Sequence, residues 1–127
     1  MPHTIVSTPE APSAIGPYSQ AMRAGNTVYL SGQIALDPAS GEVVAGGLAE
    51  QAERAFNNLA AVARAAGGSL ADCVKLTLYL TDLGQFGAVN EIMARHFAQP
   101  YPARSTVEVS ALPKGVLFEV DAIMVLP

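Results

Sequence analysis

Arg104 is the first residue whose type and position could carry chemistry. It is one of seven basic residues in the chain and follows Pro102-Ala103 at the start of a predicted strand. A guanidinium in that place can hold a small carboxylate through two parallel hydrogen bonds. The competing interpretation is a structural ion pair with Glu108 or with an acid on the neighbouring strand. Taken alone, Arg104 fits that structural role better.

Glu119 is the second candidate. It lies between Phe118 and Val120 in an apolar strand, where a carboxylate is costly to remove from water unless it is paired. Such an environment can tune a carboxylate into a general base for water. The alternative is an ion pair with Lys75 or an arginine. Asp121, two positions further along the same strand, competes for either role.

A bent loop provides the third candidate. Residues 14–20 read AIGPYSQ, and the Gly-Pro step gives the backbone a bend that could present the Tyr18 phenol to a pocket. An ordinary loop with a packed tyrosine explains the same residues. His3 and His96 lack the spacing of a zinc site, and the lone Cys73 fits packing better than nucleophilic attack. We therefore expect no metal site.

Composition limits what these residues can belong to. The chain has 127 residues, of which 50% are hydrophobic and 14% charged, so we expect one folded domain over residues 1–127 and no disorder. Contact between copies of the chain would explain the shortage of charge. The net charge of −4 argues against a nucleic-acid partner bound through a basic face. No secretory signal or membrane-spanning run is present, so we expect a cytoplasmic location without a membrane partner.

Hydrophobic periodicity and turn residues predict the elements that must position these side chains. Helices are predicted over residues 48–66 and, behind an Asp82 cap, from there to about residue 97. Each is expected to bury an apolar stripe, which in the first helix is Leu48, Ala52, Ala55, Phe56, Leu59, Val62, Ala63 and Ala66 and in the second is Phe86, Val89, Met93 and Phe97. Strands are predicted over residues 20–24, 27–33, 74–80, 104–109 and 116–126. The expected order β-β-β-α-β-α-β-β indicates an α+β two-layer sandwich, in which two helices cover one face of a mixed sheet.

Alternation along the strands predicts what the uncovered sheet face carries. In the strand 74–80 the even-numbered residues, Val74 included, form an apolar face, and residues 29, 31 and 33 are expected to share a face in the early strand. Polar side chains are expected to gather on the face away from the helices: Ser31, Tyr79, Arg104, Thr106, Glu119 and Asp121. Leu117, Ile123 and Val125 would form an apolar patch there. This mixture of polar and apolar side chains favours an interface between copies of the chain. A more specific hypothesis adds a binding site at the edge of that interface, formed between subunits.

Five blocks of the sequence resemble the RidA/YjgF family of enamine/imine deaminases. The blocks are AIGPYSQ at 14–20, SGQI at 31–34, PARS at 102–105, LPK at 112–114 and FEVDAI at 118–123. They follow the family's order and spacing over nearly the whole chain. The resemblance implies a chorismate-mutase-like fold and a homotrimer with sites in the clefts between subunits.

The resemblance also implies a reaction and roles for residues. The reaction is cofactor-free hydrolysis of 2-aminoacrylate and 2-iminobutyrate types of intermediate to 2-keto acids and ammonia. Arg104 would bind the substrate carboxylate, and Glu119 would orient or activate the attacking water. Further residues match positions that line the family's pocket: Tyr18, Ser31 and Asn90. Thr106 stands where well-known members carry a cysteine, and its backbone can still contact the water.

Two other functions compete with deamination. A chorismate mutase needs several cationic groups around a dicarboxylate, and only Arg104 can be placed near the cleft. A non-enzymatic member of the same family, such as a translation inhibitor, an RNA-directed protein or a chaperone-like trimer, is the other alternative. The presence of both Arg104 and Glu119 in an acidic chain favours the deaminase.

Overall fold

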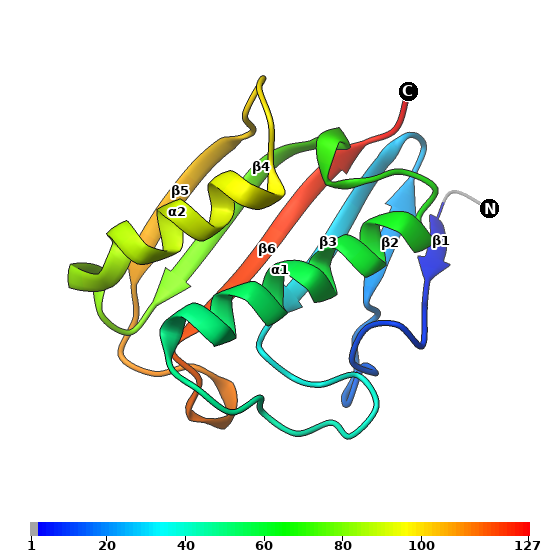
Figure 1. Ribbon diagram of the computed structural model, residues 1–127. Helices are drawn as coiled ribbons and strands as arrows, with labels where there is room; N and C mark the ends of the chain where they lie inside the picture. The colour runs from blue at the N-terminus through cyan, green and yellow to red at the C-terminus, as the bar shows by residue number, and fades with distance from the viewer. Residues whose placement is uncertain (1–2) are drawn as a thin grey trace.

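The computed structural model describes residues 3–127 and shows a six-stranded sheet with two helices on one face (Figure 1). The strands are β1 (His3–Val6), β2 (Ala21–Ala24), β3 (Thr27–Gln33), β4 (Cys73–Leu80), β5 (Ala103–Glu108) and β6 (Phe118–Val125), and the helices are α1 (Leu48–Ala65) and α2 (Phe86–His96). The sheet order is β1-β2-β3-β6-β4-β5. Only β4 and β5 pair in parallel. The α+β architecture and the element order predicted from the sequence are confirmed.

The first helix forms where its apolar period and its flanking glycines predict it. The Gly47 N–H donates to Glu50 Oε1 at 2.8 Å, which satisfies one free donor of the first turn. Gly67 has a φ of +99°, a conformation that ends the helix and suits glycine. Each apolar position of the predicted stripe is buried against the sheet: Leu48, Ala52, Ala55, Phe56, Leu59, Val62, Ala63 and Ala66.

The core lies between α1 and the two central strands. Leu76, Leu78 and Leu80 of β4 are fully buried, and Phe118 of β6 packs on Phe56 with ring centroids 5.4 Å apart. The even-numbered residues of β6 are buried as predicted: Phe118, Val120, Ala122 and Met124. Alternation therefore identifies the helix-covered face of both strands correctly.

Two irregularities shift the predicted alternation. The β4–β6 register slips between Cys73 and Lys75, so Cys73 is buried and Val74 is 48% exposed. The β3–β6 register slips between Leu30 and Gln33, so Gln33 is buried rather than lying beside Tyr29. A bulge adds one residue to one strand and reverses the facing of the residues beyond it. Leu117 was predicted to lie in the apolar patch of the open face, but it packs against the edge of the core.

The prediction that Arg104 and Thr106 lie on the open sheet face is wrong. Arg104 pairs with Leu76 and Thr106 with Leu78 in the parallel ladder. Residues paired across strands project to the same face, and Leu76 and Leu78 face the helices. The open face of β5 instead carries Ser105 and Val107, and Ser105 Oγ accepts a hydrogen bond from Lys75 Nζ.

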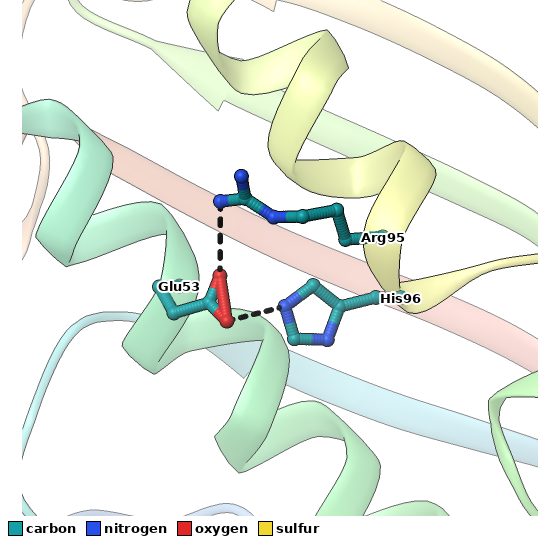
Figure 2. Close-up of polar contacts among 3 residues, drawn as sticks. All are labelled: Glu53, Arg95 and His96. Carbon is teal, nitrogen blue, oxygen red and sulfur yellow. Dashed lines mark hydrogen bonds and ion pairs between the residues drawn. The ribbon is translucent and has the colours of Figure 1, made fainter.

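A polar cluster ties the two helices together (Figure 2). Glu53 of α1 lies between two α2 residues, with His96 Nε2 3.1 Å from Oε1 and Arg95 Nη2 3.7 Å from Oε2. The His96 ring also stacks on Phe56, with centroids 5.3 Å apart. These contacts hold α2 over the β4–β5 side of the sheet (Figure 1). Within residues 3–127, neither helix has the length and apolar character needed to span a bilayer.

Candidate functional site

One cavity opens beside strands β3 and β6, and we call it the Glu119 cavity. Its volume is about 460 Å³, and its lining includes Tyr18, Ser31, Gly32, Lys114 and Glu119. Three of the residues predicted for the site, Tyr18, Ser31 and Glu119, therefore meet here. Apolar side chains complete the wall: Ile15, Ile34 and Leu36.

The loop that carries Tyr18 is held in place by Gln20. This buried side chain accepts a hydrogen bond from the Thr8 N–H at 2.6 Å and donates to the carbonyls of Thr8 and Pro12. The Tyr18 N–H donates to the Gly16 carbonyl at 2.8 Å, which closes a tight turn. The Tyr18 side chain itself is 51% exposed, so it is a cavity rim residue and not the packed tyrosine of the alternative interpretation.

Ser31 joins that loop to the sheet. Its hydroxyl donates to the Ser19 carbonyl at 2.6 Å, and its backbone N–H donates to the Gln20 carbonyl at 2.9 Å. The hydroxyl oxygen still has accepting capacity for a donor inside the cavity. Ser31 therefore both lines the cavity and anchors the wall that contains Tyr18.

Glu119 projects over the bulge of β3. A side chain at position 32 would collide with Glu119 Oε2, so glycine at that position makes room for the carboxylate. Burial, and to a smaller extent the negative charge of Asp121, raise the pKa of Glu119 above its ordinary value. The predicted alternative was an ion pair of Glu119 with Lys75 or an arginine, and no such pair forms within residues 3–127. Lys75 Nζ donates to Ser105 instead. The carboxylate is left available to a ligand in the cavity.

Asp121 is engaged elsewhere and does not replace Glu119. Its Oδ2 accepts a hydrogen bond from the Tyr79 hydroxyl at 2.8 Å. Burial first, and then this bond and the charge of Asp121, raise the pKa of Tyr79 to about 12. The phenol therefore stays protonated at neutral pH and keeps donating to Asp121. Asp121 acts on Glu119 only through its charge.

Arg104 lies in a second hollow, between α2 and β5, which we call the Arg104 hollow. Its volume is about 420 Å³, and its lining includes Asn90, Met93, Tyr101 and Arg104. Arg104 Nη1 donates to Asn90 Oδ1 at 2.8 Å. The predicted alternative, an ion pair with Glu108 or with an acid on the neighbouring strand, does not form within residues 3–127. Glu108 Oε1 instead accepts a hydrogen bond from the Leu83 N–H. Asn90, predicted to line the site, therefore lies with Arg104.

One copy of the chain does not bring Arg104 and Glu119 together. The two residues are two strands and three residue positions apart, because Arg104 aligns with Leu76 and Ala122. Standard strand spacings make that about 14 Å along the sheet. Glu119 also projects from the open face, whereas Arg104 projects toward α2. A small ligand cannot reach both groups in a single chain.

Thr106 lines neither the Glu119 cavity nor the Arg104 hollow. It is half-buried two positions after Arg104, on the same side of β5. Among residues 3–127, no three His, Cys, Asp or Glu side chains are grouped closely enough to hold a metal ion.

Sequence reasoning missed three residues that shape the site. Gln20 holds the loop of Tyr18, Gly32 makes room for Glu119, and Phe86 lies under the Arg104 guanidinium at 4.8 Å from its ring centroid. The helical period places Phe86 only on the buried stripe of the second helix. A glycine inside a predicted strand was the one available signal, because such a glycine often marks a bulge.

Comparison with known proteins identifies the family. The sequence model described as endoribonuclease L-PSP matches residues 8–126. A protein of Dermatophagoides farinae named 2-iminobutanoate/2-iminopropanoate deaminase is 46% identical over 98% of both chains. A human protein of the same name is also 46% identical, over 95% of this chain and 88% of its own length. The crystal structure of RidA from a Psychrobacter species has a TM-score of 0.94 and 46% identity, covering 97% of this chain and 99% of its own. Because the family's sequence model matches nearly the whole chain, the chain belongs to the RidA/YjgF family.

Proposed function

We propose that the protein hydrolyses reactive 2-imino acids to 2-keto acids and ammonia without a cofactor; these substrates include 2-iminobutyrate and the imine formed from the enamine 2-aminoacrylate. The observation that supports this most strongly is the Glu119 cavity, which holds an unpaired carboxylate with a raised pKa. The Arg104 hollow supplies the complementary group, a guanidinium suited to a carboxylate. Relatives at 46% identity over nearly the whole chain carry the name of this deaminase.

We propose a homotrimer in which the Glu119 cavity of one copy faces the Arg104 hollow of the next. The distance between the two groups within one chain supports this arrangement, because a substrate needs both. The open face supports it as well, since it exposes apolar area on Tyr29 and Val125, which are 52% and 43% accessible. A chorismate-mutase-like trimer buries such faces.

In this mechanism the chain supplies position and a proton acceptor. Arg104 binds the substrate carboxylate, and Glu119 holds a water next to the imine carbon. The water oxygen attacks that carbon as Glu119 takes the proton, and the C=N bond becomes a C–N single bond. Glu119 then gives that proton to the nitrogen, which yields a carbinolamine. The carbinolamine hydroxyl next loses its proton to Glu119 and the amino group receives it, so the C=O bond forms as the C–N bond breaks and ammonia and the 2-keto acid leave. In the proposed assembly the Thr106 backbone of the neighbouring copy contacts the same water, so a thiol is not required.

A coupled assay tests the function. A pyridoxal-phosphate dehydratase generates 2-aminoacrylate from serine or 2-iminobutyrate from threonine, and semicarbazide traps imine that escapes hydrolysis. We expect the wild type to lower the trapped imine. The Arg104→Ala variant is expected to lose about 10- to 100-fold in kcat/KM, because one charge-assisted contact contributes roughly 1.5–3 kcal/mol.

Two outcomes would contradict the proposal in different ways. If Arg104→Ala hydrolysed imines as fast as the wild type, the carboxylate role of Arg104 would be wrong. If the wild type had no effect on trapping while the dehydratase was active, deamination itself would be wrong. An RNA-directed role is not favoured, since the net charge of −4 offers little attraction to phosphates.

A further inference from the structure

Three residues of α2 contact the Arg104 side chain. Nη1 donates to Asn90 Oδ1 at 2.8 Å and lies 3.6 Å from Met93 Sδ, and the guanidinium carbon lies 4.8 Å from the Phe86 ring centroid. Phe86, Asn90 and Met93 are spaced four and three residues apart, so they share one face of the helix. Asn90 is the polar member of that face, and it bonds the arginine.

These contacts leave one edge of the guanidinium free. Arginine has five N–H donors, and the two partners Asn90 and Met93 both lie at Nη1. Within residues 3–127, neither Nε nor Nη2 of Arg104 donates a hydrogen bond. The Nε–H and one Nη2–H point in parallel and match the two oxygens of a carboxylate. The free edge is therefore the one that binds a carboxylate side-on.

The contacts also limit the motion of an exposed side chain. A free arginine loses about 2 kcal/mol of rotamer entropy when a ligand immobilises it. The Phe86 ring restrains the guanidinium plane through a cation–π contact, and Asn90 restrains rotation within that plane. A side chain already held in this way loses less entropy on binding.

We propose that Phe86 and Asn90 are positioning residues that present the Nε/Nη2 edge of Arg104 to the substrate carboxylate. This inference rests on the proposed function, since it deepens the role of Arg104 in that site. It changes the role of Asn90, which acts through Arg104 instead of contacting the substrate. Neither residue takes part in the chemical step.

A double-mutant cycle tests the inference. The dissociation constant of the stable product analogue 2-oxobutanoate is measured by NMR titration, which follows binding into the millimolar range. We expect Asn90→Leu to weaken binding about tenfold and Phe86→Leu several-fold. Phe86→Tyr keeps the ring and should restore binding to nearly the wild-type value. In the Arg104→Ala background, Asn90→Leu and Phe86→Leu should each change binding less than twofold.

Controls separate this inference from the others. Asn57→Leu makes the same change at an exposed position of α1 and should bind 2-oxobutanoate as the wild type does. Thermal unfolding checks that each variant is folded. Equal losses with and without Arg104, or no binding by the wild type, would overturn the positioning roles. If the coupling is absent but the wild type deaminates imines and Arg104→Ala does not, only the positioning roles are wrong and the proposed function stands. If the coupling is present but the wild type does not deaminate imines, only the proposed function is wrong.

Discussion

Glu119 combines two properties that oppose each other. A carboxylate in the partly desolvated Glu119 cavity is a stronger base for water than one in bulk solvent, because burial and Asp121 raise its pKa. The same environment disfavours the charged form in the folded protein. Gly32 contributes to both properties, because it lets the Glu119 carboxylate lie against the β3 backbone instead of in open solvent.

The variant Glu119→Gln is expected to separate these properties. It should leave 2-oxobutanoate binding unchanged while kcat falls at least tenfold, because the amide holds no proton-accepting charge. For the wild type, kcat/KM should fall on acidification at a pH above the range of an ordinary glutamate, and this limb should be absent from the residual activity of the variant. Equal losses of binding and turnover would point to a structural role for Glu119.

The same variant has a predictable effect on stability. The folded state binds the Glu119 proton more tightly than the unfolded state does, so the protonated form favours folding. Its stabilising contribution is complete below the pKa of the unfolded chain and is lost as pH rises through the folded pKa. Glu119→Gln should therefore have a higher Tm than the wild type at pH 7, and the difference should shrink toward pH 4 in thermal scans.

At the scale of elements, α2 links the core to the Arg104 hollow. Its C-terminal end is held to α1 through Glu53, His96 and Phe56, and its N-terminal half supports Arg104. Figure 2 shows Glu53 between Arg95 and His96. A loss of the His96 contacts therefore affects the packing of the helix layer directly and the site only through α2.

We expect His96→Ala to lower the free energy of unfolding by about 1–3 kcal/mol. The variant loses the ring stacking on Phe56 and one hydrogen bond to Glu53, and it leaves a small cavity. Arg95→Ala is the matched control, because the Arg95 side chain is 66% exposed and lies 3.7 Å from Glu53. It should cost less than about 0.5 kcal/mol. Equal losses in urea denaturation would show that the ion pair, not the buried ring, joins the helices.

At the scale of the whole molecule, the open sheet face is the feature that one chain leaves unexplained. Ile5, Met22, Tyr29 and Ile123 lie in one row across four strands, since each pairs with the next. Ile5 is 66% and Tyr29 52% exposed in the single chain. Exposed apolar rows of this kind favour association between copies.

The variant Tyr29→Glu should break the proposed assembly. A charge in the middle of this row would be buried without a partner, so light scattering should show the mass of one chain in place of three. Deamination should fall with the mass, because the Glu119 cavity and the Arg104 hollow then no longer face each other. Asn57→Glu, which adds the same charge on the outer side of α1, should leave both unchanged. An active wild-type monomer would disprove the shared site.

Local physics made much of this protein predictable from its sequence. Apolar residues at the helical period and at every second strand position locate α1, α2, β4 and β6 to within a few residues, because these spacings reflect backbone geometry alone. The strand β1 was not located from the sequence, since the predicted order counts three early strands but only two were given ranges, and four residues are too few to show a period. Arg104 and Glu119 could be selected as candidates because a charged side chain in an apolar strand loses hydration free energy unless a partner or ligand compensates for it.

Only the tertiary structure decided how the site is divided. Alternation separates Arg104 from Val107 but does not say which of them faces the helices; the parallel pairing of β5 with β4 decides that. The bulge before Gln33 adds a single residue to β3 and so reverses the sheet face toward which the next side chains point. One extra residue changes the composition and pattern of the sequence very little. Strand pairing and bulges depend on contacts between residues far apart in the chain. For that reason the sequence identified Arg104 and Glu119, and the structure placed them in two separate hollows on opposite faces of the sheet.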